Sequence, residues 1–366
     1  MGNGFQAADA VRPPSETAAD EEKHALANQW TQRGISLLSS PVSSDLIEAL
    51  GCFDEAIHLR QGLLLEVNPW YRWGLTAGWM NRADVLSRLG RAQEALAAYG
   101  RALEHLQKLP LEMEPAFRWR LGLAWMNRAL TLHDLGPAHD EAALASLDTS
   151  IEVLSHPALT TPRDLGTLGC AWMNRAALLM QTQPVRPAEA LEAALKALPS
   201  LVPLERSDLV AADAALKARH RSCQAIAMLL ETPPVPVDKA DDWIMTATDH
   251  VEEGLALAEH WQGRADFTEI TLQLFRFGCR IYLAFQPHFL GEFMLDVLRP
   301  RPDRVISRDF HIAAEEAIQH AAEILRQRGP TDLGLRRVDD LLLVLEGLEA
   351  AAQQIRTWRP AETTPA

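Results

Sequence analysis

The pentapeptide WMNRA occurs three times in this chain, at residues 79–83, 125–129 and 172–176. Trp and Met are uncommon residues, so chance does not explain three copies. A weaker copy, QWTQRGISLL at residues 29–38, places Trp30, Arg33, Gly34 and Leu37 at the same offsets. The tryptophans of the four copies are 49, 46 and 47 residues apart. A period of this length is typical of arrays of helical repeats.

The first full copy, GWMNRADVLSRLGRAQEALAAYGRALEHL at residues 78–106, predicts two helices. Trp79, Ala83 and Leu86 recur at intervals of three and four residues, which is the stripe of an amphipathic helix. Gly90 is a natural residue to end this helix because it accepts the left-handed conformation. A second stripe begins at Ala95. Two helices joined by so short a link form an antiparallel hairpin.

Hairpins of this kind are predicted along most of the chain. They are clear over residues 24–200 and degenerate over 201–328, where the rhythm persists without the pentapeptide. A final helix at 331–358 is expected to cap the array, as terminal units usually must. Residues 1–20 and 359–366 are expected to be disordered tails. The fold prediction is therefore an all-α solenoid of about six hairpins, forming a single domain over residues 21–358.

The unit resembles the tetratricopeptide repeat, whose pattern is W-x2-L-G-x2-Y, then A-x3-F, then a proline. Two copies match that frame best: Trp30, Gly34, Leu37, Ala49 and Phe53, and Trp79, Ala83, Leu86, Ala95 and Tyr99. Arginines replace the leucine of the pattern, and the unit is about twelve residues longer than the family's usual length. The extra residues precede each tryptophan and begin at or near a proline, so we expect a first helix lengthened by about three turns.

The asparagines of the pentapeptide, Asn81, Asn127 and Asn174, are the main candidates for ligand contact. Asparagine is a mediocre helix former, and two residues after each tryptophan it points about 200° away around the helix. The resemblance implies that these asparagines line a concave groove and hydrogen-bond the backbone of a bound peptide. Gln32 occupies the same position in the weaker copy. The alternative is that the asparagines bond the neighbouring repeat.

The other residues of the pentapeptide are expected to serve mainly in packing. The tryptophans and the alanines Ala83, Ala129 and Ala176 lie on the apolar stripe, where the small alanine lets the second helix approach. Met80, Met126 and Met173 lie between the asparagine and the core. They either fill gaps, which we favour, or adapt to varied partners in the groove.

An arginine occupies the same position in every unit, three residues after the position of the tryptophan. These arginines are Arg33, Arg82, Arg128, Arg175, Arg221 and Arg280. In the structural interpretation, which we favour, each guanidinium bridges adjacent hairpins through a carboxylate such as Glu94 or Glu141. In the functional one, the row of arginines clamps the carboxylates of an acidic peptide.

The stretch at 287–308 is the least repeat-like part of the array. Its apolar half contains Phe289, Leu290, Phe293, Met294 and Leu295, and four arginines follow. An insertion of this length is either a partner-docking segment or a segment that folds back on the array. We favour folding back, because exposure of those side chains would leave a large apolar patch.

Composition and motifs exclude several classes of function. A formal net charge of −14 and a pI near 5.3 oppose the basic surface that nucleic acids require. The four cysteines form no ligand pair, and no signal sequence or long apolar run is present. No phosphate-binding glycine loop, GxSxG or HExxH motif occurs. We therefore expect a cytoplasmic protein that is not an enzyme and uses no metal or cofactor, nucleic acid or membrane.

The function that this sequence favours is binding of a partner protein or peptide by a scaffold, adaptor or chaperone. One alternative is a regulatory sensor whose groove closes on a small molecule or peptide. Another is an accessory subunit of an enzyme complex, or a catalyst, with its site near residues 241–308. Self-association is compatible with all three.

Overall fold

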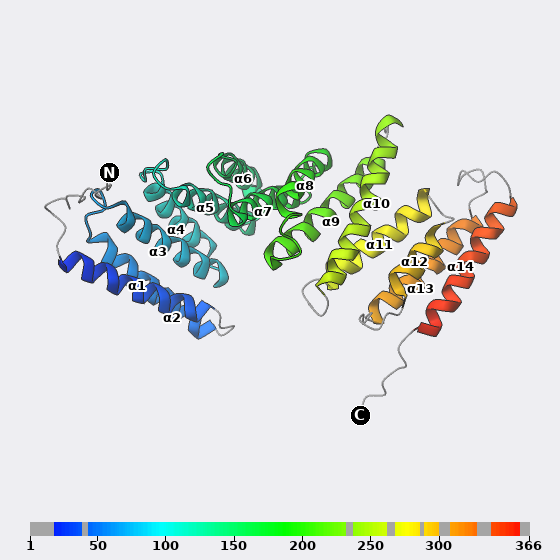
Figure 1. The fold of residues 1–366 in the computed structure, drawn as a ribbon, viewed down its shortest axis with the longest axis horizontal. Helices are drawn as coiled ribbons and strands as arrows, with labels where there is room; N and C mark the ends of the chain where they lie inside the picture. Colours follow the sequence, from blue (N-terminus) through cyan, green and yellow to red (C-terminus); the bar gives the residue numbers. More distant parts are fainter. Residues whose placement is uncertain are drawn as a thin grey trace, which may run out of the picture. The chain divides into compact units, whose positions relative to one another are not determined.

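A computed structural model describes residues 18–38, 43–231, 237–261, 268–285, 289–299, 308–327 and 338–358. These residues form fourteen α-helices and one short 3-10 helix, with no β-strand among them (Figure 1). The chain divides into two compact units, Met1–Asp164 and Leu165–Ala366.

The first unit consists of three consecutive hairpins. Each packs against the next, because α2 contacts α3 and α4 contacts α5. The helices are α1 (Ala18–Leu38) with α2 (Ser43–Gln61), α3 (Pro69–Arg88) with α4 (Ala92–Leu106), and α5 (Pro115–Asp134) with α6 (Asp140–Leu154), preceded by the 3-10 turn η1 (Pro137–His139). This stacking confirms the α-solenoid predicted from the repeats.

The ends of these helices follow from local sequence. Pro69 and Pro115 occupy the first helical positions, and Asn68 caps α3 by accepting a hydrogen bond from the backbone of Trp70 at 2.9 Å. Helices α3 and α5 therefore each start ten residues before their tryptophan, which confirms the predicted lengthening. Gly90 has φ of 73°, a conformation that glycine adopts without a side-chain clash.

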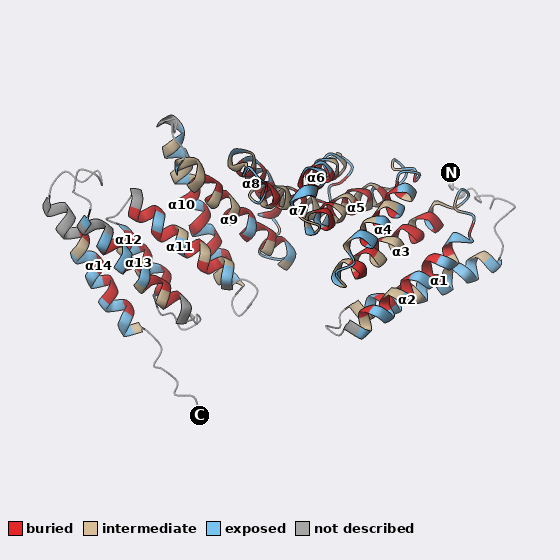
Figure 2. Cartoon of the chain, turned by 180° about the vertical axis from the view of Figure 1, so that it is seen from behind, coloured by how far each residue is buried: buried red, intermediate tan, exposed pale blue. Residues whose placement is uncertain are grey.

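The interior of each hairpin is built differently from the prediction. Ala83, Ala129 and Ala176 are fully or almost fully buried, as expected. The methionines are buried with them, exposing 6% to 8%: Met80, Met126 and Met173. The tryptophans, predicted as core residues, are only half-buried and lie at the edge of the core: Trp30, Trp79, Trp125 and Trp172. The buried face is therefore centred between Met and Ala, and Figure 2 shows such stripes along the contacting helices.

The second unit continues the hairpins from within α7, which spans the boundary between the units. Its helices are α7 (Pro162–Leu179), α8 (Pro187–Leu201), α9 (Leu209–Glu231), α10 (Val237–His260), α11 (Thr268–Phe285), α12 (Leu290–Leu298), α13 (Arg308–Gln327) and α14 (Val338–Trp358). Successive helices pack in order from α8 to α11, and α13 then joins α11 to α14. The degenerate repeats beyond residue 200 thus keep the hairpin architecture.

The insertion folds back on the array in its described part, residues 289–299. It forms α12, which packs against α14 and α11 and buries Leu290, Phe293 and Met294. Leu295 is half-buried, and Phe289 keeps 55% of its surface exposed. Residues 286–288 and 300–307 of this region lie outside the described part.

The ends of the array differ slightly from the predicted bounds. Helix α1 begins at Ala18, so residues 18–20 of the expected tail are helical, and residues 1–17 lie outside the described part. The capping helix is described from Val338, where Val344, Leu348, Ala351 and Ile355 form its buried stripe. Residues 328–337 and 359–366 are not described. None of the described helices is long and apolar enough to cross a membrane.

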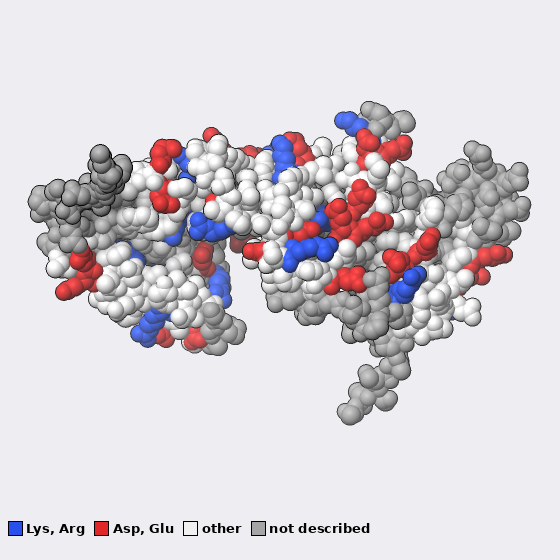
Figure 3. Space-filling view, in the orientation of Figure 1, with Lys and Arg blue, Asp and Glu red and all other residues white. Residues whose placement is uncertain are grey.

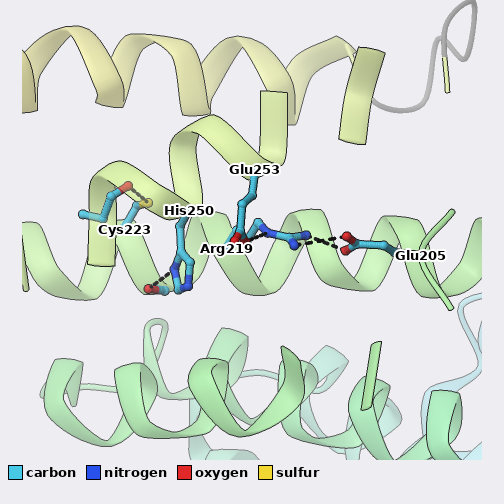
Figure 4. Close-up of polar contacts among 7 residues, drawn as sticks. Glu205, Arg219, Cys223, His250 and Glu253 are labelled. Carbon is cyan, nitrogen blue, oxygen red and sulfur yellow. Dashed lines mark hydrogen bonds and ion pairs between the residues drawn. The ribbon is translucent and has the colours of Figure 1, made fainter. Parts of the chain in front are cut away.

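A buried ion pair ties together three elements of the second unit (Figure 4). Arg219 of α9 is 1% exposed and donates to both carboxylate oxygens of Glu205, at 2.6 and 3.2 Å. Its Nε donates to Glu253 of α10 at 3.1 Å. Close by, Ser222 and His250 share a hydrogen bond of 2.8 Å. Arg219 thus joins the α8–α9 turn to both helices of the next hairpin.

Candidate binding groove

A groove of about 500 Å³ runs across the first helices of the three hairpins in the first unit. Most of its lining residues are spaced three or four apart along each helix, which places them on one face. They are His24, Asn28, Gln32 and Ile35 on α1, Trp73, Ala77, Asn81 and Asp84 on α3, and Trp119, Leu123 and Asn127 on α5. The repeated register of these helices therefore builds one continuous wall.

Several predicted site residues line this groove. Gln32, Asn81 and Asn127 lie on the wall, and Met80 contributes as well. The remaining predicted residues are not among those that line it: Arg82, Met126, Arg128, Met173, Asn174 and Arg175. Asn174 is a half-buried residue of α7 in the second unit.

Asn127 also takes part in contacts between repeats. It hydrogen-bonds the carboxyl group of Asp84, to which the Tyr99 hydroxyl donates as well. Burial raises the pKa of Asp84 above its usual range, although both hydrogen bonds act in the opposite direction. The alternative in which an asparagine bonds the neighbouring repeat thus applies to Asn127, which also faces the groove.

Arg60 reaches the groove from α2 and is only 2% exposed. Its Nη1 donates to the Thr31 hydroxyl at 3.0 Å and its Nη2 to the Asn28 amide oxygen at 2.6 Å, while its buried Nε has no hydrogen-bond partner. A Cβ at Gly74 would lie 2.6 Å from that Nε, so glycine makes room for the guanidinium. Burial lowers the pKa of Arg60 to about 10.

Arg120 enters the same groove from α5. Its Nη1 donates to the Trp73 carbonyl at 3.0 Å, and its guanidinium carbon lies 3.2 Å from the centre of the Trp73 ring. Burial, followed by the charges of Arg163 and Arg60, lowers the pKa of Arg120 to about 9. The hydrogen-bond partners of Arg60 and Arg120 described above are all neutral. The groove thus places two arginines against one carboxyl group, that of Asp84, whose pKa is raised by burial.

Three tryptophans, Trp70, Trp73 and Trp119, also line the groove, and the buried Phe117 packs behind Trp70 and Trp73. Trp70, Trp73 and Phe117 have ring centres 5.1 to 6.3 Å apart, and Trp70 is 44% exposed. Arg163 lies over the Trp119 ring at 4.2 Å. Such rings offer flat apolar surfaces whose side chains have few rotatable bonds.

The repeated arginines lie on the opposite flank of the helices and contact other helices. Arg82 pairs with Asp54 of the preceding hairpin at 2.6 Å, and Arg33 and Arg128 bond Glu48 and Ser146 within their own hairpins. Their guanidinium groups also lie 5.4 to 5.8 Å from the ring centres of the neighbouring tryptophans. Of these three, only Arg82 bridges adjacent hairpins through a carboxylate, as the structural interpretation predicts, whereas Arg33 and Arg128 contact residues of their own hairpins. The suggested Glu94 pairs with Arg91.

In the second unit the repeated arginines make less uniform contacts. Arg221 donates to Gln224 on its own helix at 2.7 Å, and Arg280 pairs with Glu231 of α9 at 3.6 Å. The buried arginine of α9 is Arg219, two residues before Arg221.

The sequence contained a partial signal for the residues that prediction missed. Trp73 and Trp119 lie eight residues before Asn81 and Asn127, on the same helical face, and extending the register backwards would have found them. Arg60 could not be found in this way, because it comes from a second helix.

Comparison with known proteins assigns no family. No family model matches the chain, and no curated protein matches it. BtubC of P. vanneervenii is 13% identical with a TM-score of 0.49, covering 78% of this chain and 94% of that one. The S. pombe nuclear import adaptor Nro1 is 13% identical with a TM-score of 0.39, covering 89% and 99%. A circular tandem repeat protein is 12% identical with a TM-score of 0.24, covering 93% and 77%.

The hairpins and the groove themselves define the class of this molecule. It is an all-α helical-repeat protein whose first unit carries a polar, aromatic and cationic groove.

Proposed function

We propose that this protein is a non-catalytic scaffold or adaptor of the tetratricopeptide-repeat type, which holds an extended segment of a partner protein in the groove of the first unit. The observation that carries the proposal is the shared wall on which Gln32, Asn81 and Asn127 lie, with Arg60 and Arg120 beside them. Gln32, Asn81 and Asn127 occupy the repeated position of the first helices. Arg120 also lies on one of these first helices, α5, whereas Arg60 comes from the second helix α2.

Binding of a peptide backbone is the first task of this wall. A side-chain amide donates and accepts hydrogen bonds at once, so a row of amides on successive repeats suits an extended main chain of varied sequence. Trp73 and Trp119 offer stacking surfaces beside the amides.

The arginines specify the chemistry of the segment. A buried cation surrounded by neutral groups has lost water without gaining an opposite charge, so an anionic group in the groove would restore the balance. A planar guanidinium binds carboxylates through paired hydrogen bonds. We therefore propose that the partner segment presents an acidic side chain or a terminal carboxylate to Arg60 and Arg120.

A small-molecule sensor is the second candidate. The groove volume of about 500 Å³ falls within the range of pockets that enclose small ligands. A small dicarboxylate that bound there would raise the melting temperature of the isolated protein without any partner.

The experiment that tests the scaffold is affinity capture from the lysate of the source organism, followed by mapping of the captured segment with overlapping peptides. The test variant is Gln32→Ala/Asn81→Ala, and Asn174→Ala is the matched control because it changes the same repeated residue outside this groove. We expect the test variant to weaken peptide binding about thirtyfold by calorimetry, since each of the two lost hydrogen bonds contributes about 1 kcal/mol.

The control should bind as tightly as the wild type, with both variants unchanged in helicity and melting temperature. An equal loss in the Asn174→Ala variant would refute the assignment of this groove. Stabilisation by small carboxylates with no captured segment would favour the sensor.

A further inference from the structure

A second groove, of about 570 Å³, lies in the second unit between α10 and α12. Its lining residues follow one face of each helix. Those of α10 are Glu252, Leu255, Ala256 and Glu259, and those at and within α12 are Phe289, Glu292, Phe293, Asp296 and Val297. The spacing on both helices is three, four and seven residues, as expected for a single helical face.

Helix α11 lies between these walls, since it packs against α10 and also against α12. It contributes Tyr282, whose ring stacks on Phe293 with centres 4.6 Å apart. The Tyr282 hydroxyl donates to Glu252 at 3.0 Å, which fixes that carboxylate at the edge of the groove. The groove is thus a channel with two helical walls and an aromatic floor.

The charges of this channel are mostly negative. Four carboxylates line it, from Glu252, Glu259, Glu292 and Asp296, against the one cation Arg299. Acidic side chains gather on the face over α10 to α12 in Figure 3. Between them the floor is apolar, and Phe289 stands at the rim with 55% of its surface exposed. Acidic walls around an apolar floor select a partner with the reverse arrangement.

We infer that this channel docks a basic amphipathic helix of a partner protein. A channel between two helical walls has the shape that accepts a third helix, whose apolar residues at positions i, i+3, i+4 and i+7 enter the floor. Lysines or arginines flanking that stripe would face the carboxylates of both walls, which supplies charge complementarity and register. This site belongs to the second unit and has the opposite charge to the groove of the first.

The test uses the full-length protein and three fluorescent peptides measured by anisotropy. The first is a sixteen-residue peptide with a leucine stripe flanked by lysines, the second replaces the lysines by glutamates, and the third scrambles the first. Two variants with the same charge change are compared. Glu292→Lys/Asp296→Lys reverses the channel wall, whereas Asp241→Lys/Asp242→Lys changes exposed residues near the other end of α10.

We expect the lysine peptide to bind the wild type with a Kd below about 100 µM and the other two at least tenfold more weakly. Reversing the charges of the channel wall should weaken binding of the lysine peptide about tenfold or more. The control variant should bind this peptide with an affinity within about twofold of the wild type. Phe289→Ser, at an exposed position, should weaken it about threefold through lost apolar contact. Circular dichroism verifies that each variant keeps its helices.

Four results would overturn the proposal. The lysine peptide binds more weakly than the stated limit, the scrambled peptide binds as well as the lysine peptide, or the control variant loses as much affinity as the channel variant. A fourth is binding that appears only after Arg301→Ser/Arg304→Ser, which would mean that the chain's own basic stretch occupies the channel.

Discussion

Arg60 in the first unit and Arg219 in the second are both almost completely buried, but they are held in different ways. Arg219 is enclosed by Glu205 and Glu253, so its charge is balanced within the protein. Arg60 donates only to the neutral side chains of Thr31 and Asn28. A balanced buried arginine is a structural residue, whereas an unbalanced one on a groove wall is suited to a ligand. Hairpins of the same architecture thus hold buried arginines in two different electrostatic environments, depending on a few polar positions.

Replacing each of these arginines by methionine should separate the two roles, and gives the largest effect that we predict. Arg219→Met leaves the buried carboxylate of Glu205 without its cation, which should lower the free energy of unfolding by about 3–5 kcal/mol. Arg60→Met leaves only neutral groups behind and removes an unbalanced buried charge, so stability should stay unchanged or rise. Urea unfolding followed by circular dichroism measures both. Equal losses of unfolding free energy in the two variants would contradict the distinction between a balanced and an unbalanced buried arginine.

His220 gives the second prediction, on the pH dependence of the second unit. Burial, aided by Arg221, lowers the pKa of His220 to about 4 from an ordinary 6.5. Between these pH values the unfolded chain binds a proton that the folded protein excludes. The contribution of neutral His220 to the free energy of unfolding is therefore fully present above pH 6.5 and is lost as the pH falls toward 4. The loss should reach about 2–3 kcal/mol near pH 4.

Urea unfolding at a series of pH values tests this expectation, with His220→Gln as the comparison. The variant lacks the titrating group, so its stability should fall less over that interval. Parallel curves for the two proteins would show that His220 is not the cause.

The third prediction concerns recognition by the unbalanced arginines. For a captured acidic segment, Arg120→Met should weaken binding about tenfold to a hundredfold, because a hydrogen bond between charged groups contributes about 1.5–3 kcal/mol. Replacing the segment's carboxylate by an amide should weaken binding to the wild type by a similar factor and add little in the variant. Calorimetry on the four combinations provides the measurement. Additive losses would show that Arg120 and the carboxylate do not interact.

The hairpin architecture could be predicted from the sequence because it depends on the spacing of apolar residues along one helix. The first helix was predicted from the spacing of Trp79, Ala83 and Leu86. Its end was predicted from Gly90, and its added length from Pro69. The degree of burial was less predictable. It depends on the angle at which the next helix meets the stripe, and this angle centres the core on Met80 and Ala83 and leaves Trp79 at its edge.

The candidate groove could be predicted only where the repeat register supplies its residues. Gln32, Asn81 and Asn127 were found because the repeat register carries them to a common wall. Arg60 and the α10–α12 channel were missed, since their residues lie at positions that do not recur from one repeat to the next. Their chemistry arises from packing between helices, which the spacing along one helix does not encode.

The smallest predicted effect tests whether the repeated arginines hold the hairpins together. Arg82 pairs with Asp54 of the preceding hairpin at 2.6 Å, and the two side chains are 22% and 50% exposed. Water and salt screen such a pair, so Arg82→Gln should lower stability by about 0.5–1 kcal/mol and leave peptide affinity unchanged. A double-mutant cycle with Asp54→Asn isolates the pair, and its coupling energy should shrink at high salt. If Arg82→Gln instead weakens binding of the acidic segment as Arg120→Met does, the repeated arginines belong to the groove.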